Sequence, residues 1–236
     1  MRSKKSFGYV LVVVALALVF MACVSGCGRK QHVSFRYDFA ISPKKDQVLK
    51  DVTVYLPFPT KDGKPIREIY ESLMRDYNKY WADDHPNARV SLENTEYGTM
   101  LKISIPEVDQ RGFGLEGGYG FEEAYTEEKI APHYMLAPRK DVKRLSHLIG
   151  YVADTYVYAD FKGGDELGLA LEYDISILSP PLFPLDYVPE DGYTAYLGFD
   201  EPPIKPGNRV KYVKRKGWTK MKLADNGYDK ESYGQE

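Results

Sequence analysis

The sequence ELGLALEYDISIL, residues 166–178, alternates between large apolar side chains and small or polar ones. Its apolar positions, every second residue from Leu167 to Ile177, would share one face of an extended chain, because successive side chains of a β-strand point to opposite sides. This period predicts a strand with one face in the protein core. It is the clearest core strand in the chain and indicates a β-rich fold.

A glycine-rich turn precedes this strand. The residues Lys162-Gly163-Gly164-Asp165 separate it from a second apolar run at 155–161, and two such runs around a short glycine turn predict a β-hairpin. Residues 106–140, rich in Gly, Pro and acidic residues, are expected to be irregular. Shorter apolar runs predict further strands at residues 33–41, 52–58, 89–92, 100–105, 193–199, 208–214 and 218–223.

Residues 66–81 carry the one convincing helix signal. Their apolar residues recur about every 3.6 residues and form one stripe, and the polar run from Asp83 to Asn87 ends the pattern. A second, short helix is expected at residues 141–149. These elements predict a mainly β (α+β) fold, an antiparallel sandwich or barrel-like sheet with one packed amphipathic helix.

The same patterns divide the chain into regions. We expect residues 33–223 to form a single β-rich domain, because no linker-like stretch interrupts the predicted strands. The last residues, 224–236, are polar and are expected to be a disordered tail.

The N-terminal segment has the three regions of a secretory signal peptide. A basic head with Arg2, Lys4 and Lys5 precedes an uncharged apolar stretch, and small residues close the segment. The uncharged run is also long enough to cross a bilayer, which takes roughly 20 residues, so an uncleaved transmembrane helix is the alternative. Both interpretations place the rest of the chain on the non-cytoplasmic side, because the basic end stays inside.

The end of this segment, Val24-Ser25-Gly26-Cys27, resembles the lipobox of bacterial lipoproteins. The resemblance implies that Val24, Ser25 and Gly26 form the recognition sequence, that residues 1–26 are removed, and that Cys27 carries diacylglycerol. It also implies that residues 27–32 act as a lipidated tether to the cell membrane or the outer membrane. The resemblance covers only the first 27 residues.

Composition narrows the possible partners. Without its signal peptide the chain has 29 basic and 34 acidic residues and no strongly basic region, which argues against nucleic acid. It keeps Cys27 but not Cys23, so no intramolecular disulfide is expected. The 20 tyrosines suit strand faces, and a minority of them could line a carbohydrate or peptide surface. A basic run with Trp218, at residues 211–222, predicts either a polar strand face or contact with anionic lipid headgroups.

Candidate chemical groups are few. Asp83, Asp84 and His85 could bind a metal or supply acid–base groups, but the same residues suit a polar helix end. Glu122 and Glu123 belong to an acidic stretch, with Glu127 and Glu128, that could bind calcium, although its spacing differs from a helix-loop-helix calcium site.

A glycine pattern at residues 112–117 matches the dinucleotide fingerprint only formally. That fingerprint needs a strand directly before it and a helix directly after it, so a flexible surface loop is expected instead.

We therefore expect a membrane-anchored envelope lipoprotein with a non-enzymatic binding or structural role. No catalytic residue and no cofactor is predicted, because the chain has no Gly-x-Ser-x-Gly elbow and no metal-type histidine spacing. Its expected partners are the membrane, through the lipid on Cys27, and an envelope protein or carbohydrate. The alternative is a small envelope hydrolase or metal-dependent enzyme, with its site at residues 83–85 and 106–140.

Overall fold

The computed structural model of the chain describes residues 30–125, 133–144, 150–179, 188–197 and 210–227. Predictions for the signal peptide, for the lipobox-like motif with Cys27, for Glu127 and Glu128 and for most of the polar tail lie outside these residues. Within them the fold is mainly antiparallel β-structure with one short α-helix, which confirms the predicted class.

Eleven of the described strands form one antiparallel sheet. Two of them join at its side, where β9 (Lys140–Arg144) pairs with β10 and β13 (Lys211–Lys214) pairs with β11. The main path runs through β5 (Arg89–Thr95), β6 (Gly98–Val108), β2 (Leu49–Leu56), β10 (Gly150–Lys162), β14 (Gly217–Gly227), β12 (Val188–Leu197), β11 (Glu166–Ser179), β1 (Lys30–Pro43) and β7 (Phe113–Ala124).

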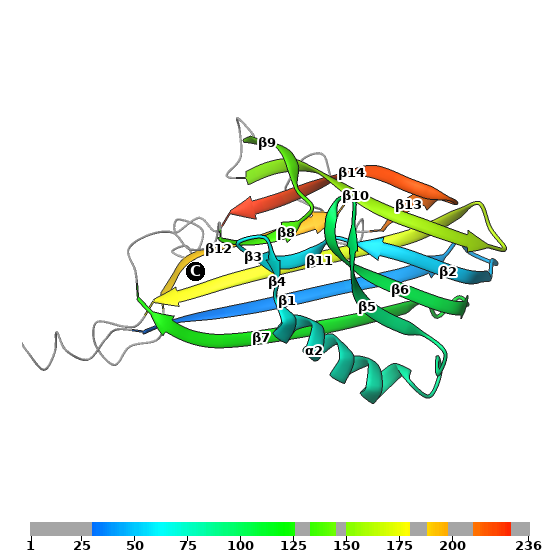
Figure 1. Cartoon of the computed structure of the whole chain (residues 1–236), viewed down its shortest axis with the longest axis horizontal. Helices are drawn as coiled ribbons and strands as arrows, with labels where there is room; N and C mark the ends of the chain where they lie inside the picture. The colour runs from blue at the N-terminus through cyan, green and yellow to red at the C-terminus, as the bar shows by residue number, and fades with distance from the viewer. Residues whose placement is uncertain (1–29, 126–132, 145–149, 180–187, 198–209, 228–236) are drawn as a thin grey trace, which may run out of the picture.

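The sheet folds over on itself, so that its two halves pack face to face. Tyr37 of β1 is separated from β2 by four strands of the sheet, yet its hydroxyl donates a hydrogen bond to the carbonyl oxygen of Pro57, just after β2, at 2.8 Å. A small second sheet is formed by β3 (Phe58–Lys61), β4 (Lys64–Pro65) and β8 (Tyr134–Ala137). Figure 1 shows the long strands running side by side along the long axis.

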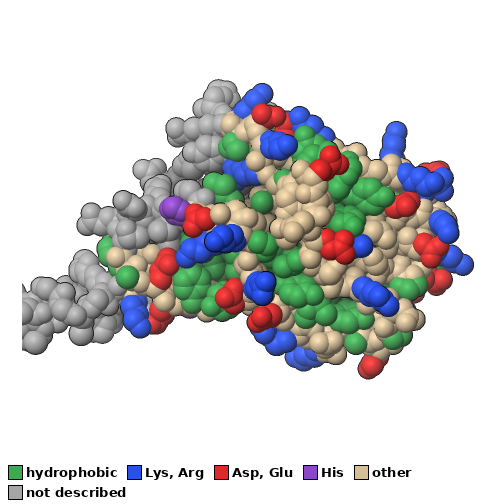
Figure 2. Space-filling view, viewed as in Figure 1, with side chains coloured by type: hydrophobic (Ala, Val, Ile, Leu, Met, Phe, Trp, Pro, Cys, Tyr) green, Lys and Arg blue, Asp and Glu red, His purple; other side chains and the backbone are tan. Residues whose placement is uncertain are grey.

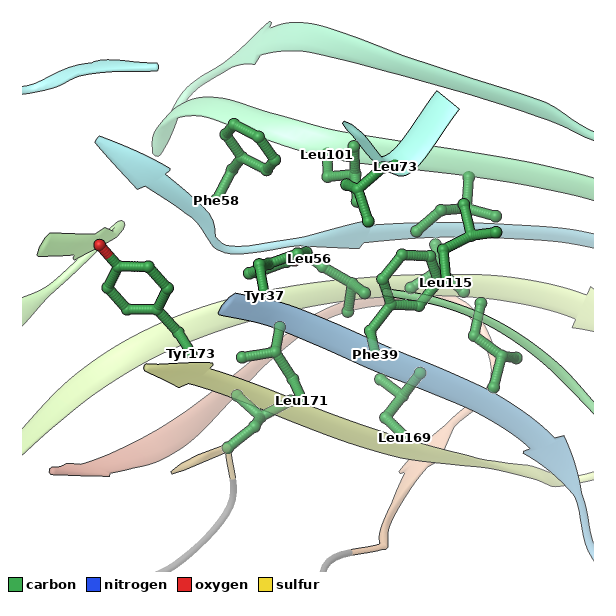
Figure 3. Close-up of a cluster of buried hydrophobic side chains, with 14 of the residues drawn as sticks. Tyr37, Phe39, Leu56, Phe58, Leu73, Leu101, Leu115, Leu169, Leu171 and Tyr173 are labelled. Carbon is green, nitrogen blue, oxygen red and sulfur yellow. The ribbon is translucent and has the colours of Figure 1, made fainter. Parts of the chain in front are cut away.

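The core lies between these two halves. The predicted core face of residues 166–178 is confirmed, because Leu169, Tyr173 and Ile175 are fully buried. Their partners on the neighbouring strand β1 are Ile41, Tyr37 and Phe35, in that order. Side chains from β1, β2, β6, β7, β11 and the helix converge there (Figure 3). Burial of this apolar surface is the main contribution to folding.

The predicted hairpin at residues 162–165 is wrong. Strand β10 pairs with β2, β9 and β14, whereas β11 pairs with β1, β12 and β13, so the turn carries the chain from one half of the sandwich to the other. Phe161 and Leu167, on either side of the turn, both face the core. Gly163 has a positive φ, and a Cβ atom there would lie 2.3 Å from the carbonyl oxygen of Val48, so the turn packs against the start of β2.

The prediction of an irregular region at residues 106–140 is also wrong. It contains the end of β6, all of β7 and β8, and the glycine pattern at 112–117 lies in and just before β7, where a surface loop was expected. Every second residue from Phe113 to Gly117 is buried in β7. The third of these positions is a glycine and not an apolar side chain, so the strand pattern is hidden in the sequence. Helix residues pack on that glycine, because a Cβ atom there would lie 2.9 Å from Cγ of Leu73.

Three further predicted boundaries are corrected. Residues 140–144 form strand β9 and not a helix, while 145–149 lie outside the described residues. Strand β1 begins at Lys30 and takes up part of the predicted tether, and β14 continues to Gly227, beyond the predicted end of the domain. The strand expected at 52–58 is interrupted at Pro57, because proline cannot donate to a sheet.

The predicted helix is present as α2 (Arg67–Asp76), followed by a π-helical turn, η1 (Tyr77–Trp81). Its buried residues Ile69 and Leu73 belong to the core, as the apolar stripe predicts. Figure 1 shows α2 beside β7 and β5, which are the two edge strands of the main path.

Side chains of α2 also hydrogen-bond the backbone of both edge strands. Ser72 Oγ and Asp76 Oδ2 accept hydrogen bonds from the backbone amides of Gly118 and Glu116 on β7, each at 3.1 Å. The Tyr70 hydroxyl donates to the carbonyl oxygen of Val90 on β5 at 2.9 Å. The helix thus satisfies edge groups that could otherwise pair with another chain.

Candidate functional site

The three residues at the end of the predicted helix have structural contacts. The His85 ring packs against Trp81 and Phe113, with centroids 5.5 and 5.4 Å apart. Asp84 faces the Arg111 guanidinium at 3.6 Å, and Asp83 is exposed. The His85 amide donates to the Trp81 carbonyl, which continues the helical turn.

The two acidic candidates on β7 point to different sides of the sheet. Glu122 forms an ion pair with Lys30 at 3.3 Å on the outer side. Glu123 accepts a hydrogen bond from Gln31 at 3.1 Å and lies 3.9 Å from the Lys61 ammonium. The two carboxylates therefore have separate basic or amide partners.

The residues proposed for an enzymatic site do not converge. His85 touches Phe113 at the start of β7, whereas His133 contacts Asp62, beside Lys61 and near Glu123 at the other end. A strand rises about 3.3 Å per residue, so these two positions lie roughly 30 Å apart. In the described part of the chain, no three His, Cys, Asp or Glu residues are grouped as a metal site.

The structure instead brings together five aromatic rings on the outer face of the sheet, which we call the aromatic cluster. It consists of Tyr55 on β2, Tyr97 in the turn between β5 and β6, Tyr156 and Tyr158 on β10, and Trp218 on β14. Tyr158 lies opposite Tyr55 on one side and opposite Trp218 on the other, so strand register sets the cluster.

The rings of the aromatic cluster are in direct contact. Tyr97 stacks on Tyr156, with centroids 4.0 Å apart and planes 13° apart, and meets Trp218 edge-on at 4.7 Å. Tyr158 lies 5.3 Å from Trp218 and 5.5 Å from Tyr55, both in edge-on arrangements. Each contact of this kind contributes about 0.5–1.5 kcal/mol beyond area burial, so the rings hold one another in place.

An open groove of about 520 Å³ lies beside the cluster and is lined by its rings Tyr55, Tyr158 and Trp218. All three are only partly buried, so ring surface faces the groove. Its other walls come from β2, β5, β6, β10 and the turn between β5 and β6, and they carry hydroxyl, amide and charged groups. On the face shown in Figure 2, hydrophobic and aromatic side chains form patches among charged ones.

A hydrogen-bonded group fixes one wall of the groove. Glu93 accepts hydrogen bonds from Lys102 Nζ at 3.1 Å, from the Tyr55 hydroxyl at 3.1 Å and from Ser91 Oγ at 3.3 Å. The hydrogen bond from Lys102, helped by those from Tyr55 and Ser91, lowers the pKa of the Glu93 carboxyl. The carboxylate is therefore ionised at neutral pH and compensates the charge of Lys102.

Two lysines of the predicted basic run share one buried carboxylate beside the cluster. Lys220 and Lys222 of β14 contact the two oxygens of Asp154, at 2.5 and 2.6 Å, and the Asp154 side chain is only 4% exposed. Hydrogen bonds from Lys220 and Lys222 lower the pKa of Asp154 to about 2. The remaining basic residues lie in and after β13, at the end of the sheet remote from Lys30; they are Lys211, Lys214, Arg215 and Lys216.

A second depression, also of about 520 Å³, opens near the start of β1. Phe35, Tyr119, Phe121 and Tyr134 line it, and the Lys61 ammonium lies 4.8 Å from the centre of the Tyr134 ring. A hydrogen bond that the Lys61 ammonium donates to the Tyr134 hydroxyl oxygen raises the pKa of Lys61, and burial raises the pKa of Tyr134.

Sequence reasoning missed the aromatic cluster, because its members are spread from residue 55 to residue 218. The only local signal was the alternation of Tyr156 and Tyr158 with small inward residues. No helix among the described residues is long and apolar enough to cross a membrane. Comparisons with protein-family models, with curated proteins and with solved structures find no match for the chain.

Proposed function

We propose that this chain is an exported lipoprotein, anchored by lipid on Cys27 to the cell membrane or the outer membrane, that acts by binding through the groove beside the aromatic cluster. Its domain lies on the non-cytoplasmic side of that membrane. The observation that carries the binding role is this open, pre-formed groove, in which partly exposed rings alternate with hydrogen-bonding groups.

The anchor is supported by the N-terminal sequence and by the start of the fold. A basic head, an uncharged apolar run and Val24-Ser25-Gly26-Cys27 are the features of a lipoprotein signal. Strand β1 begins at Lys30, so only three residue steps, about 11 Å of extended chain, separate Cys27 from the domain. A lipidated Cys27 would hold the start of β1 close to the headgroups.

A binding role is favoured over catalysis by the distribution of reactive groups. The histidines and acidic residues that the enzymatic alternative needs are spread along β7 and are engaged in ion pairs, hydrogen bonds and ring contacts. The groove, in contrast, presents rigid aromatic surface, which supplies contact area at a low cost in side-chain entropy.

The anchor is tested in cells with Cys27→Ser. The wild-type chain should incorporate a labelled fatty acid and lose its signal peptide, and the variant should do neither. A matched Cys23→Ser variant should behave as wild type, because Cys23 is removed with the signal peptide. Normal labelling of Cys27→Ser, or an unlabelled wild-type chain, would refute the lipid anchor.

The binding role is tested by placing a photoactivatable cross-linking residue at Ser104, which lines the groove on β6. Illuminated cells should give a cross-linked product at this position, and Trp218→Ala in the same chain should abolish it. The control position is Tyr80, a tyrosine on η1 that is 61% exposed and lies outside the groove. Equal products at both positions, or none at Ser104, would contradict a binding role of the groove.

A further inference from the structure

We infer that the groove beside the aromatic cluster binds a neutral glycan, with a pyranose ring stacked against Trp218 and Tyr158. This inference rests on the proposed binding role of the groove. It names the class of ligand, which neither the anchor nor the presence of a groove specifies.

The composition of the groove lining suits a sugar ring. Three of the ten lining side chains are the rings Tyr55, Tyr158 and Trp218, and the other seven are polar or charged. Five of the ten carry a hydroxyl, and Asn94 adds an amide. A pyranose has an apolar C–H face and a rim of hydroxyls, so it needs aromatic surface and many neutral hydrogen-bond partners together. A purely apolar ligand would leave the polar wall without partners, which costs free energy.

The charges of the groove also favour a neutral ligand. Among the described residues that line the groove, Lys102 is the only basic one, and both oxygens of Glu93 accept its hydrogen bonds, at 3.1 and 3.3 Å. The other charged lining residues are Glu96 and Asp160, both acidic. An anionic ligand such as a phospholipid headgroup or a sulfated polysaccharide would therefore meet a groove lining whose net charge is negative. A neutral saccharide meets no such repulsion.

The rings of the aromatic cluster are already ordered. Trp218 touches three rings of the cluster, Tyr55, Tyr97 and Tyr158, at centroid distances between 4.7 and 5.9 Å. The Tyr55 hydroxyl is held by Glu93. Because these rings keep their orientation without a ligand, binding does not have to order them, and this increases affinity.

The position of the groove along the molecule also favours a glycan. Asn226 on β14 pairs with Thr194 on β12, which pairs with Asp174 on β11 and so leads to Arg36 on β1. Trp218 lies eight residues from Asn226 along β14, in the direction away from Lys30, so it is on the order of 40 Å from Lys30 along the strands. The groove is thus remote from the end that the lipid would hold. A ligand bound there would lie at a distance from the bilayer that holds the lipid, as an envelope glycan does.

The experiment uses the full chain purified in detergent and carrying Trp81→Phe. The sequence has two tryptophans, so Trp218 is then the single fluorophore of its kind. The probes are chitotetraose, cellotetraose and maltotetraose, with a heparin tetrasaccharide as the anionic comparison. At least one neutral tetrasaccharide should shift Trp218 emission saturably, with affinity confirmed by calorimetry. The heparin fragment should give no saturable shift.

Two kinds of variant locate the site. By calorimetry, Tyr158→Ala should weaken binding about tenfold or more, because a stacking surface is lost. Ser104→Arg should block the groove from β6 without removing any ring, so it separates loss of binding from loss of folding. Tyr80→Ala, an exposed tyrosine outside the groove, should bind as the parent chain does.

Each outcome is decisive. If none of the neutral tetrasaccharides binds while the cross-linked product at Ser104 still forms in cells, the glycan inference is wrong and the binding role stands. If a tetrasaccharide binds equally well to the Ser104→Arg chain, the groove is not the site. If binding saturates as expected but Cys27 carries no lipid, the glycan inference stands and the anchor fails.

Discussion

Asp154 is an acidic side chain almost closed off from water, with a lysine on each of its carboxylate oxygens. Its pKa is lowered from 3.8 to about 2, mainly by hydrogen bonds from Lys220 and then Lys222. A carboxyl whose pKa is lower in the folded state stabilises the fold above its unfolded pKa. That contribution is lost as the pH falls through the folded pKa.

We therefore predict that stability falls between about pH 4 and pH 2 and that Asp154 contributes to this fall. Asp154→Asn should lower the melting temperature at pH 7 and make the melting curve less dependent on pH in that interval. Asp165→Asn, at an exposed turn position, is the control and should keep the wild-type profile. An unchanged pH profile in the Asp154 variant would contradict the role assigned to this pair of contacts.

Adjacent residues of β11 have opposite environments, which gives a direct test of its register. Ile175 is fully buried and Ser176 is only partly buried on the other face. Ile175→Asp should lower the free energy of unfolding by about 3 kcal/mol or more, because it buries an uncompensated charge and removes core packing. Ser176→Asp should be mild. Similar denaturant midpoints for the two variants would show that the register is wrong.

At the scale of the elements, the contact of α2 with β7 depends on a single missing side chain. A Cβ atom at Gly117 would lie 2.9 Å from Cγ of Leu73 and 3.0 Å from the carbonyl oxygen of Ile69, whereas at Gly118 its closest neighbour is at 3.4 Å. Gly117→Ala should therefore push the helix away and lower the free energy of unfolding by about 1–3 kcal/mol.

Gly118→Ala is the matched control and should be tolerated, because it changes the same residue type one position along the same strand. The two variants are compared by denaturant unfolding. If both lose the same stability, strand propensity and not helix packing determines the effect.

Elements with strong local patterns could be predicted from the sequence, and those without them could not. Residues 166–178 and the helix at 66–81 repeat their apolar positions often enough to show their period. Strand β7 was missed, because Gly117 replaces an apolar side chain where the helix needs room. The sequence at 162–165 predicts a hairpin wrongly, because its composition fits both a turn within one sheet and a turn between layers.

The candidate site could not be predicted from the sequence for a related reason. Tyr55, Tyr97 and Trp218 become neighbours only through strand register, which requires the order β6-β2-β10-β14 to be known. The fold class depended on local periods, whereas the site depended on pairings between distant segments. Only the individual tyrosines were visible as a composition bias.

At the scale of the whole molecule, the two ends of the long sheet differ. Lys30 and Glu122 pair at the end where β1 starts, and Lys162 lies at the opposite end, where β10 stops. If lipid on Cys27 holds the protein, a fluorescent label at Glu122 should be quenched by quenchers in the headgroup layer much more strongly than a label at Lys162. Equal quenching at both positions would mean that the protein lies along the bilayer.

The central position of β14 has a consequence for the timing of assembly. It is the last strand described in the chain, yet it pairs with β10 on one side and β12 on the other and joins the two halves of the sheet. Strand β1 also pairs with a segment that is synthesised much later, since the Ser34 hydroxyl donates a hydrogen bond to the carbonyl oxygen of Ser176, 142 residues away. A nascent chain in which residues 217–227 have not yet been synthesised keeps the facing edges of β10 and β12 open, so it is exposed to chaperones, proteases and self-association until those residues are made.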